Sequence, residues 1–149
     1  TLQDLLFEIT KSFESITEKK LNLNFENAKK RISIKRSAEL TYGIRNFVGN
    51  AVKFSKKNIN INLVGNNQTT TLQISDDGPG FPDDIYKIIG EPYISTKSKK
   101  LKSKAGLGLG TFIGKTLLER KKANIEFLKS SNGGALVEIS WNNKDFVWN

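Results

Sequence analysis

The stretch Arg45-Asn-Phe-Val-Gly-Asn-Ala-Val-Lys-Phe54 decides the fold, because it combines a helical apolar pattern with a polar face. The apolar residues around it recur at intervals of three and four: Leu40, Ile44, Phe47, Val48, Ala51 and Val52. This spacing predicts a helix over residues 38–55, with Asn46, Asn50 and Lys53 on one face. Amide oxygens suit Mg²⁺, which takes one or two protein ligands beside substrate phosphates. We therefore expect Asn50 to bind metal and Lys53 to contact a phosphate.

A second segment, Asp76-Asp-Gly-Pro-Gly-Phe81, follows a run over residues 69–75 that alternates as a strand does. Gly78 and Gly80 permit backbone angles and close approaches that a Cβ would forbid. A carboxylate at a strand end beside such a backbone can approach a flat base. We expect Asp76 to accept a hydrogen bond from an adenine amine.

The third segment, Gly106-Leu-Gly-Leu-Gly110, leads directly into an apolar helix. Backbone N–H groups are free at a helix start, and the positive end of the helix points the same way. Such a segment is an anion site, and it suits the phosphates of ATP.

Each segment alone has an ordinary structural explanation. An Asn on an amphipathic helix is usually solvated, Asp-Asp-Gly-Pro-Gly is more often a plain turn, and alternating glycines often serve the backbone only. The ordered combination is far more specific than any one member.

Together the segments resemble the ATP-binding catalytic domain of sensor histidine kinases, within the superfamily that includes DNA gyrase, Hsp90 and MutL ATPases. The likeness covers residues 21–141. Four boxes appear in family order: residues 46–54 resemble the asparagine box, 76–80 the first glycine box, 91–97 the phenylalanine-containing box, and 106–110 the second glycine box. Among these kinases, the last two boxes look most like the RegB/PrrB/ActS redox-responsive group.

The resemblance implies roles for individual positions. Asn50 would bind Mg²⁺ with Asn46 assisting, and Lys53 would face phosphate. Phe54 or its neighbours would lie against adenine, and Asp76 would hold the adenine amine. The remaining nucleotide-binding positions implied are Gly78, Gly80, Tyr93, Thr96, Lys97, Gly106, Leu107, Gly108, Leu109 and Gly110. The glycines of the lid would close over the triphosphate.

The superfamily's hydrolytic ATPases carry Glu where this chain has Asn46, and an amide cannot accept a proton from attacking water. This favours a kinase. The chain contains no His, so its nucleophile would be a histidine on an upstream dimerisation domain, which then serves a response regulator. We expect a homodimeric parent and a monomeric fragment. A serine kinase of the anti-sigma type and an ATP-gated interaction module without transfer remain alternatives.

Composition sets further limits. The chain has 149 residues, 37% hydrophobic and 26% charged, as expected of one globular domain. It lacks an apolar run of roughly 20 residues, a signal peptide pattern and Cys, so we expect a soluble, cytoplasmic piece of a parent that can be membrane-anchored. The net charge of +9 suggests nucleic acid as a binding partner. Much of that charge lies in the predicted lid, at Lys97, Lys99, Lys100, Lys102 and Lys104, and we expect no direct nucleic-acid partner.

Two domain regions are predicted. Residues 1–20 form a helical stub with an apolar stripe at Leu2, Leu5, Leu6, Ile9, Phe13 and Ile16. The stub is either a helix from the upstream dimerisation domain or linker, or a surface helix packed on this domain. Residues 21–149 form the ATP-binding catalytic domain.

The predicted fold class is α/β (α+β), a two-layer sandwich in which a mixed sheet packs against three main helices. The resemblance implies the Bergerat-type ATP-binding fold. Helices are predicted over residues 2–19, 38–55, 83–89 and 109–120. Strands are predicted over residues 21–26, 32–36, 58–64, 69–75, 125–129 and 135–141.

Overall fold

A computed structural model describes residues 1–28, 30–81 and 107–148, and for residues 107–110 it describes the backbone alone. Within these ranges the elements follow one another as α1 (Leu2–Glu14), β1 (Lys20–Asn27), α2 (Ala38–Phe54), β2 (Asn58–Gly65), β3 (Thr69–Asp76), α5 (Leu107–Glu119), β4 (Asn124–Lys129), β5 (Ala135–Asn142) and α6 (Asn143–Phe146).

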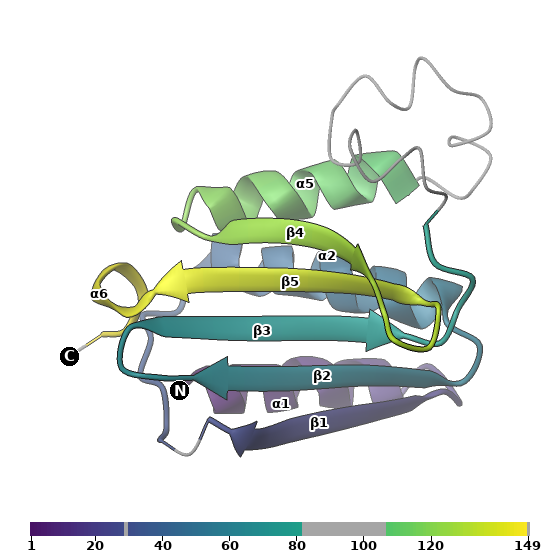
Figure 1. Ribbon diagram of the computed structural model, residues 1–149, viewed down its shortest axis with the longest axis horizontal. Helices are drawn as coiled ribbons and strands as arrows, with labels where there is room; N and C mark the ends of the chain where they lie inside the picture. The colour runs from purple at the N-terminus through teal and green to yellow at the C-terminus, as the bar shows by residue number, and fades with distance from the viewer. Residues whose placement is uncertain (29, 82–106, 149) are drawn as a thin grey trace.

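The strands form one mixed sheet in the order β1-β2-β3-β5-β4. β1 runs parallel to β2, and the other neighbours are antiparallel. Figure 1 shows α1, α2 and α5 on the same face of the sheet, and none of the described helices covers the face toward the viewer. The predicted two-layer architecture, a mixed sheet against three main helices, is confirmed.

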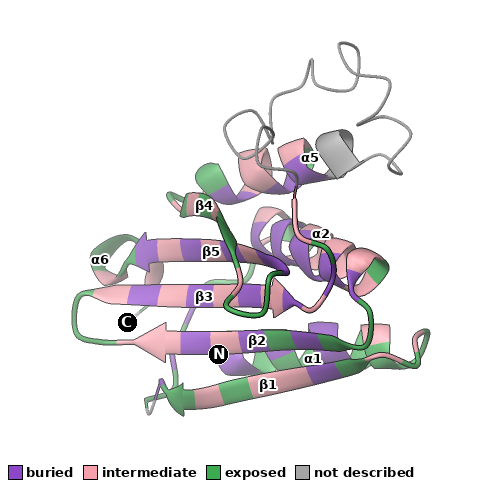
Figure 2. Cartoon of the chain, turned by 45° about the vertical axis from the view of Figure 1, so that its right-hand side comes forward, coloured by how far each residue is buried: buried purple, intermediate pink, exposed green. Residues whose placement is uncertain are grey.

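Alternation along β3 orients the residue at its end. Its even-numbered residues Thr70, Leu72, Ile74 and Asp76 are buried, and the residues between them are partly exposed (Figure 2). Because side chains of a strand alternate between the two faces of a sheet, the inward row ends in a carboxylate. Asp76 therefore lies under the helical layer, at the edge of the core.

The core fills the space between α2 and the sheet. Ile44 and Val48 of α2 are fully buried, as are Ile59 and Leu63 of β2. Gly43 lets α2 approach α5 closely, because a Cβ there would lie 2.6 Å from the side chain of Leu118. This contact fixes how α5, and with it the second glycine box, lies on α2.

The first helix also contributes to this core. Thr1 caps α1 in a capping box with Asp4. The stripe residues Leu2, Leu5, Leu6 and Ile9 are at most 2% exposed and belong to the same hydrophobic cluster as α2 and the sheet. The assignment of residues 1–20 to an upstream domain or linker stays a prediction.

Some predicted elements differ from the structure. The prediction of a strand over residues 32–36 is wrong, because only Ile34 of this segment pairs, in an isolated bridge with Val147. Ile32 and Ile34 are buried, and their spacing of two imitates the alternation of a strand. A strand also needs a ladder of backbone hydrogen bonds to a neighbour, which this segment does not form. The first helix ends at Glu14 instead of residue 19, and α6 was not predicted. The helix predicted over residues 83–89 lies outside the described residues.

In the described ranges, no helix has both the length and the apolar character needed to cross a bilayer.

Candidate functional site

Segments from distant parts of the sequence meet at one end of the sheet. The end of α2, the end of β3, the turn between β4 and β5, and the start of α5 all lie at the right-hand side of Figure 1. They enclose a cavity of about 240 Å³. Four residues predicted for the site line it, namely Asn50, Phe54, Asp76 and Gly80.

Aromatic side chains form much of the cavity wall. Phe47 of α2 and Phe127 of β4 have ring centroids 6.1 Å apart, and Phe81 meets Phe127 edge-on at 6.3 Å. Ile74 and Val137 complete the apolar lining. A slot with aromatic and aliphatic walls and few polar groups suits a flat heterocycle such as a purine.

Asp76 is the charged group in this lining. The residue is only 5% exposed. Its Oδ1 accepts hydrogen bonds from the backbone N–H groups of Gly78, at 2.8 Å, and Ala135, at 3.4 Å. Burial raises the pKa of Asp76 above its ordinary value, although these two bonds act in the opposite direction. The structure thus supplies a fixed, poorly hydrated acceptor that would gain from a donor on a ligand.

The neighbouring carboxylate, Asp77, has a different environment. It accepts the backbone N–H groups of Lys56, Lys57 and Asn58 at 2.8 to 3.1 Å. Desolvation is the largest single influence and raises the pKa of Asp77, but the hydrogen bonds from Lys57, Lys56 and Asn58 together outweigh it and lower the pKa to about 2. Asp77 therefore fastens the segment after α2 to the end of β3, outside the cavity.

Glycines permit the close backbone contacts around Asp76. A Cβ at Gly78 would overlap the carbonyl oxygen of Phe54, and one at Gly134 would overlap that of Asp76. Gly80 has a φ of 76°, and a Cβ there would lie 2.7 Å from the carbonyl oxygen of Gly133. The close approaches predicted for Gly78 and Gly80 are present.

The polar face of α2 divides into two parts. Asn50 lines the cavity, and its Nδ2 donates to Oγ1 of Thr111 at 3.3 Å. This bond uses the amide nitrogen and leaves Oδ1 as the atom suited to a metal. Asn46 lies outside the lining, and its Nδ2 donates to the carbonyl of Tyr42 at 3.0 Å. Lys53 is exposed and also lies outside the lining, with Nζ 5.6 Å from the centre of the Phe54 ring.

The other predicted site residues are only partly covered by the structure. Gly78 adjoins the cavity through its contact with Phe54. Leu107, Gly108, Leu109 and Gly110 form the first turn of α5 in the described backbone. Tyr93, Thr96, Lys97 and Gly106 lie outside the described residues.

In the described part of the chain, no group of three or more His, Cys, Asp or Glu side chains is arranged to hold a metal ion. Asn50 is the cavity residue whose oxygen has the hard, neutral character that Mg²⁺ accepts beside phosphates.

Sequence reasoning missed several residues of the cavity. Thr111 follows the second glycine box directly, so its position beside an anion site was a usable signal. Phe127 and Ala135 belong to no motif, and they reach the cavity because β4 and β5 pair beside β3.

Comparisons with known proteins agree on one family. A family model described as histidine kinase-, DNA gyrase B- and HSP90-like ATPase matches residues 35–145. The sensor histidine kinase RegB of Cereibacter sphaeroides is 33% identical over 124 residues, which cover 72% of this chain and 27% of RegB. The chain thus spans about a quarter of this relative's length.

Solved structures show the same fold. The nucleotide-free catalytic domain of the histidine kinase ThkA has a TM-score of 0.77 at 19% identity, covering 95% of this chain and 92% of that one. Full-length ShkA in complex with AMPPNP has a TM-score of 0.76 at 20% identity, covering 100% of this chain and 31% of ShkA.

Proposed function

The chain belongs to the histidine kinase-, DNA gyrase B- and HSP90-like ATPase family, and on this premise we propose that it is the ATP-binding catalytic domain of a sensor histidine kinase. The observation that carries the proposal is the cavity in which Asn50, Phe54, Asp76 and Gly80 meet. Its walls are aromatic and aliphatic, and its buried carboxylate accepts hydrogen bonds.

ATP is proposed to bind with its adenine in this cavity. Asp76 accepts a hydrogen bond from the adenine amine, and the apolar walls exclude water from the base. The triphosphate extends toward the start of α5, where backbone N–H groups and the helix dipole favour anions. Thr111 lies in the first turns of α5 and lines the cavity, so the start of this helix is next to the proposed base site.

Mg²⁺ is proposed to bind through Oδ1 of Asn50, the residue whose nitrogen is already held by Thr111. When bound, the ion neutralises charge on the phosphates. Asn46 as an assisting residue and Lys53 as a phosphate contact remain predictions. Phe54 lines the cavity and is proposed to contact the base.

The phosphoryl acceptor is proposed to be a histidine on a separate dimerisation domain, which passes the group to a response regulator. Asn46 cannot act as a base toward water, so ATP is kept for another nucleophile. The chain itself has no His. The likeness to RegB supports a parent similar to this sensor histidine kinase. That the parent belongs to the redox-responsive group and acts as a homodimer remains a prediction from the resemblance.

The experiment is phosphoryl transfer in trans. The domain is mixed with Mg·ATP labelled at the γ-phosphate and a histidine-containing dimerisation domain of a RegB-like kinase. We expect acid-labile label on the histidine domain, and loss of labelling with Asn50→Ala. Saturable ATP binding without transfer would favour the interaction module, and acid-stable label on serine would favour the serine kinase.

A further inference from the structure

Lys19 reaches the C-terminal end of α2 from a distant part of the sequence. Its Nζ donates to the carbonyl oxygen of Val52 at 2.6 Å and to that of Ser55 at 2.8 Å. The last carbonyls of a helix have no partner within it, and the helix dipole makes this end negative. An ammonium group here both satisfies the carbonyls and complements the dipole.

The turn that Lys19 holds also forms the cavity. Ala51 and Phe54, on either side of Val52, line it. The carbonyl of Phe54 lies so close to Gly78 that a side chain there would overlap it. The last turn of α2 is therefore fixed on one side by Lys19 and on the other by the loop that follows Asp76.

Lys19 stands in the connection between α1 and β1, and α1 is itself fastened to α2. A Cβ at Gly49 would lie 3.4 Å from the Phe13 ring, so this ring packs on the helix backbone. The guanidinium of Arg45 donates to Oγ of Ser12 at 2.7 Å and lies 5.0 Å from the centre of the Phe13 ring. The chain before β1 thus contacts α2 along much of its length.

We propose that Lys19 is a positioning residue for the nucleotide site, which holds the last turn of α2 so that Phe54 and Ala51 stand in register with Asp76. The inference rests on the proposed ATP binding. If Lys19 holds this turn, then nucleotide affinity and the position of Lys19 are linked. A displacement of the connection between α1 and β1, which carries Lys19, would then lower the affinity for the nucleotide.

Lys19 also acts on Asp76 through its charge. Burial is the main influence on the pKa of Asp76 and raises it, Asp77 raises it further, and the field of Lys19 lowers it. Loss of the Lys19 charge should therefore raise the pKa of Asp76. The adenine amine needs the ionised carboxylate as its acceptor. As the pH falls, the variant without this charge would therefore lose the ionised form at a higher pH than the wild type.

The test is a calorimetric titration of Mg·ATP into the wild-type chain, Lys19→Met, Lys19→Arg and the matched control Lys20→Met. Lys20 is the next residue and its side chain is exposed, so its replacement removes the same charge without touching α2. We expect Lys19→Met to weaken binding about tenfold. Lys19→Arg should restore most of the affinity, and Lys20→Met should behave as wild type.

A second readout reports the effect of the Lys19 charge on Asp76, which a general loss of stability would not produce. In Lys19→Met, the pH at which ATP affinity is half lost should move upward, and in Lys19→Arg it should not. Unchanged affinity in Lys19→Met, or an equal loss in Lys20→Met, overturns the inference while the proposed function stands. A folded wild type that binds no Mg·ATP overturns the proposed function itself. If Lys19→Met does not fold, Lys19→Gln decides the question in the same titration.

Discussion

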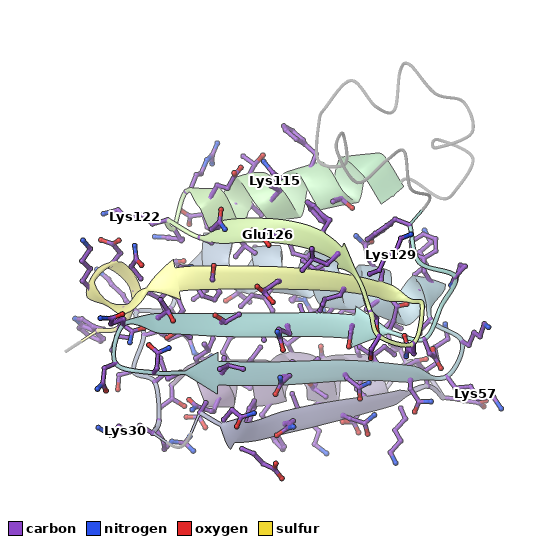
Figure 3. All side chains as sticks on the ribbon, viewed as in Figure 1. Lys30, Lys57, Lys115, Lys122, Glu126 and Lys129 are labelled. Carbon is purple, nitrogen blue, oxygen red and sulfur yellow. The ribbon has the colours of Figure 1, made fainter. Side chains whose placement is uncertain are left out.

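The two ends of the sheet both carry a cavity, and the two cavities differ in size and in chemistry. At the Asp76 end the cavity measures about 240 Å³ and has aromatic walls. At the opposite end, the β2–β3 turn, the chain after β1 and the start of α6 border a larger cavity of about 830 Å³. Figure 3 shows Lys57 and Lys30 at these two ends.

Three of the residues that line the larger cavity, Asn66, Thr70 and Asn143, bind one another. Nδ2 of Asn143 donates to the carbonyl of Asn66 at 2.7 Å, and Oγ1 of Thr70 donates to Oδ1 of Asn143 at 2.8 Å. At the Asp76 end, by contrast, a carboxylate is buried against the cost of desolvation. The smaller cavity therefore offers a ligand a buried acceptor at Asp76, and we assign the nucleotide to it although the other cavity has the greater volume.

The largest effect is expected from Gly134→Ala. The new Cβ would overlap the carbonyl oxygen of Asp76, so the β4–β5 turn or the Asp76 loop must move. We expect the free energy of unfolding to fall by about 3 kcal/mol, and ATP binding to be lost. Urea unfolding and calorimetry measure the two quantities.

Gly65→Ala is the matched control at the other end. A Cβ there would lie 3.5 Å from Cδ1 of Ile32, an ordinary contact. Equal losses in the two variants would contradict the special role given to the Asp76 end.

Asp76→Asn should separate binding from stability. A hydrogen bond to a charged group contributes about 1.5 to 3 kcal/mol, so ATP affinity should fall roughly tenfold to a hundredfold. Stability at pH 7 should not fall, because burial disfavours the charged form that the variant lacks. Unchanged affinity by calorimetry, in a variant that unfolds normally in urea, would remove Asp76 from the site.

Asp77→Asn should show the converse pattern. The folded pKa of Asp77, about 2, lies below its ordinary value of 3.8, so its stabilising effect is complete above 3.8 and is lost as the pH falls toward 2. We expect the variant to be less stable than wild type at pH 7, and this gap to narrow on acidification. Thermal unfolding at several pH values measures it. A gap that widened at low pH would refute this account of the carboxylate.

The smallest effect is expected at the larger cavity. Asn67 and Lys144 line it far from Asp76. Asn67→Ala and Lys144→Gln should each change ATP affinity by no more than about twofold, as is usual for surface substitutions. A tenfold loss by calorimetry in either variant would show that the larger cavity takes part in nucleotide binding.

Sequence periodicity predicted most of the fold because the elements concerned bury one face. The three-and-four spacing of α2 and the alternation of β3 each report which side meets the core. The same alternation places Asp76 in line with Leu72 and Ile74, so its burial could be read from sequence. The alternation over residues 32–36 was misleading, because Ile32 and Ile34 are buried in the core without forming a strand.

The candidate site was only partly predictable, for a physical reason. Asn50, Asp76 and Gly80 belong to local motifs, whereas Phe127 and Ala135 enter the cavity through long-range strand pairing that no local pattern reports. Lys19 likewise acts on carbonyls more than thirty residues away.

The most direct test of the central claim, that ATP occupies the Asp76 end, is to titrate Mg·ATP into the ¹⁵N-labelled chain and follow backbone amide shifts by NMR. We expect saturable shifts that are largest at Gly78, Gly80 and Ala135, with residues 65–70 nearly unchanged. Shifts concentrated at residues 65–70, or no shifts in a folded chain, would contradict binding at the Asp76 end.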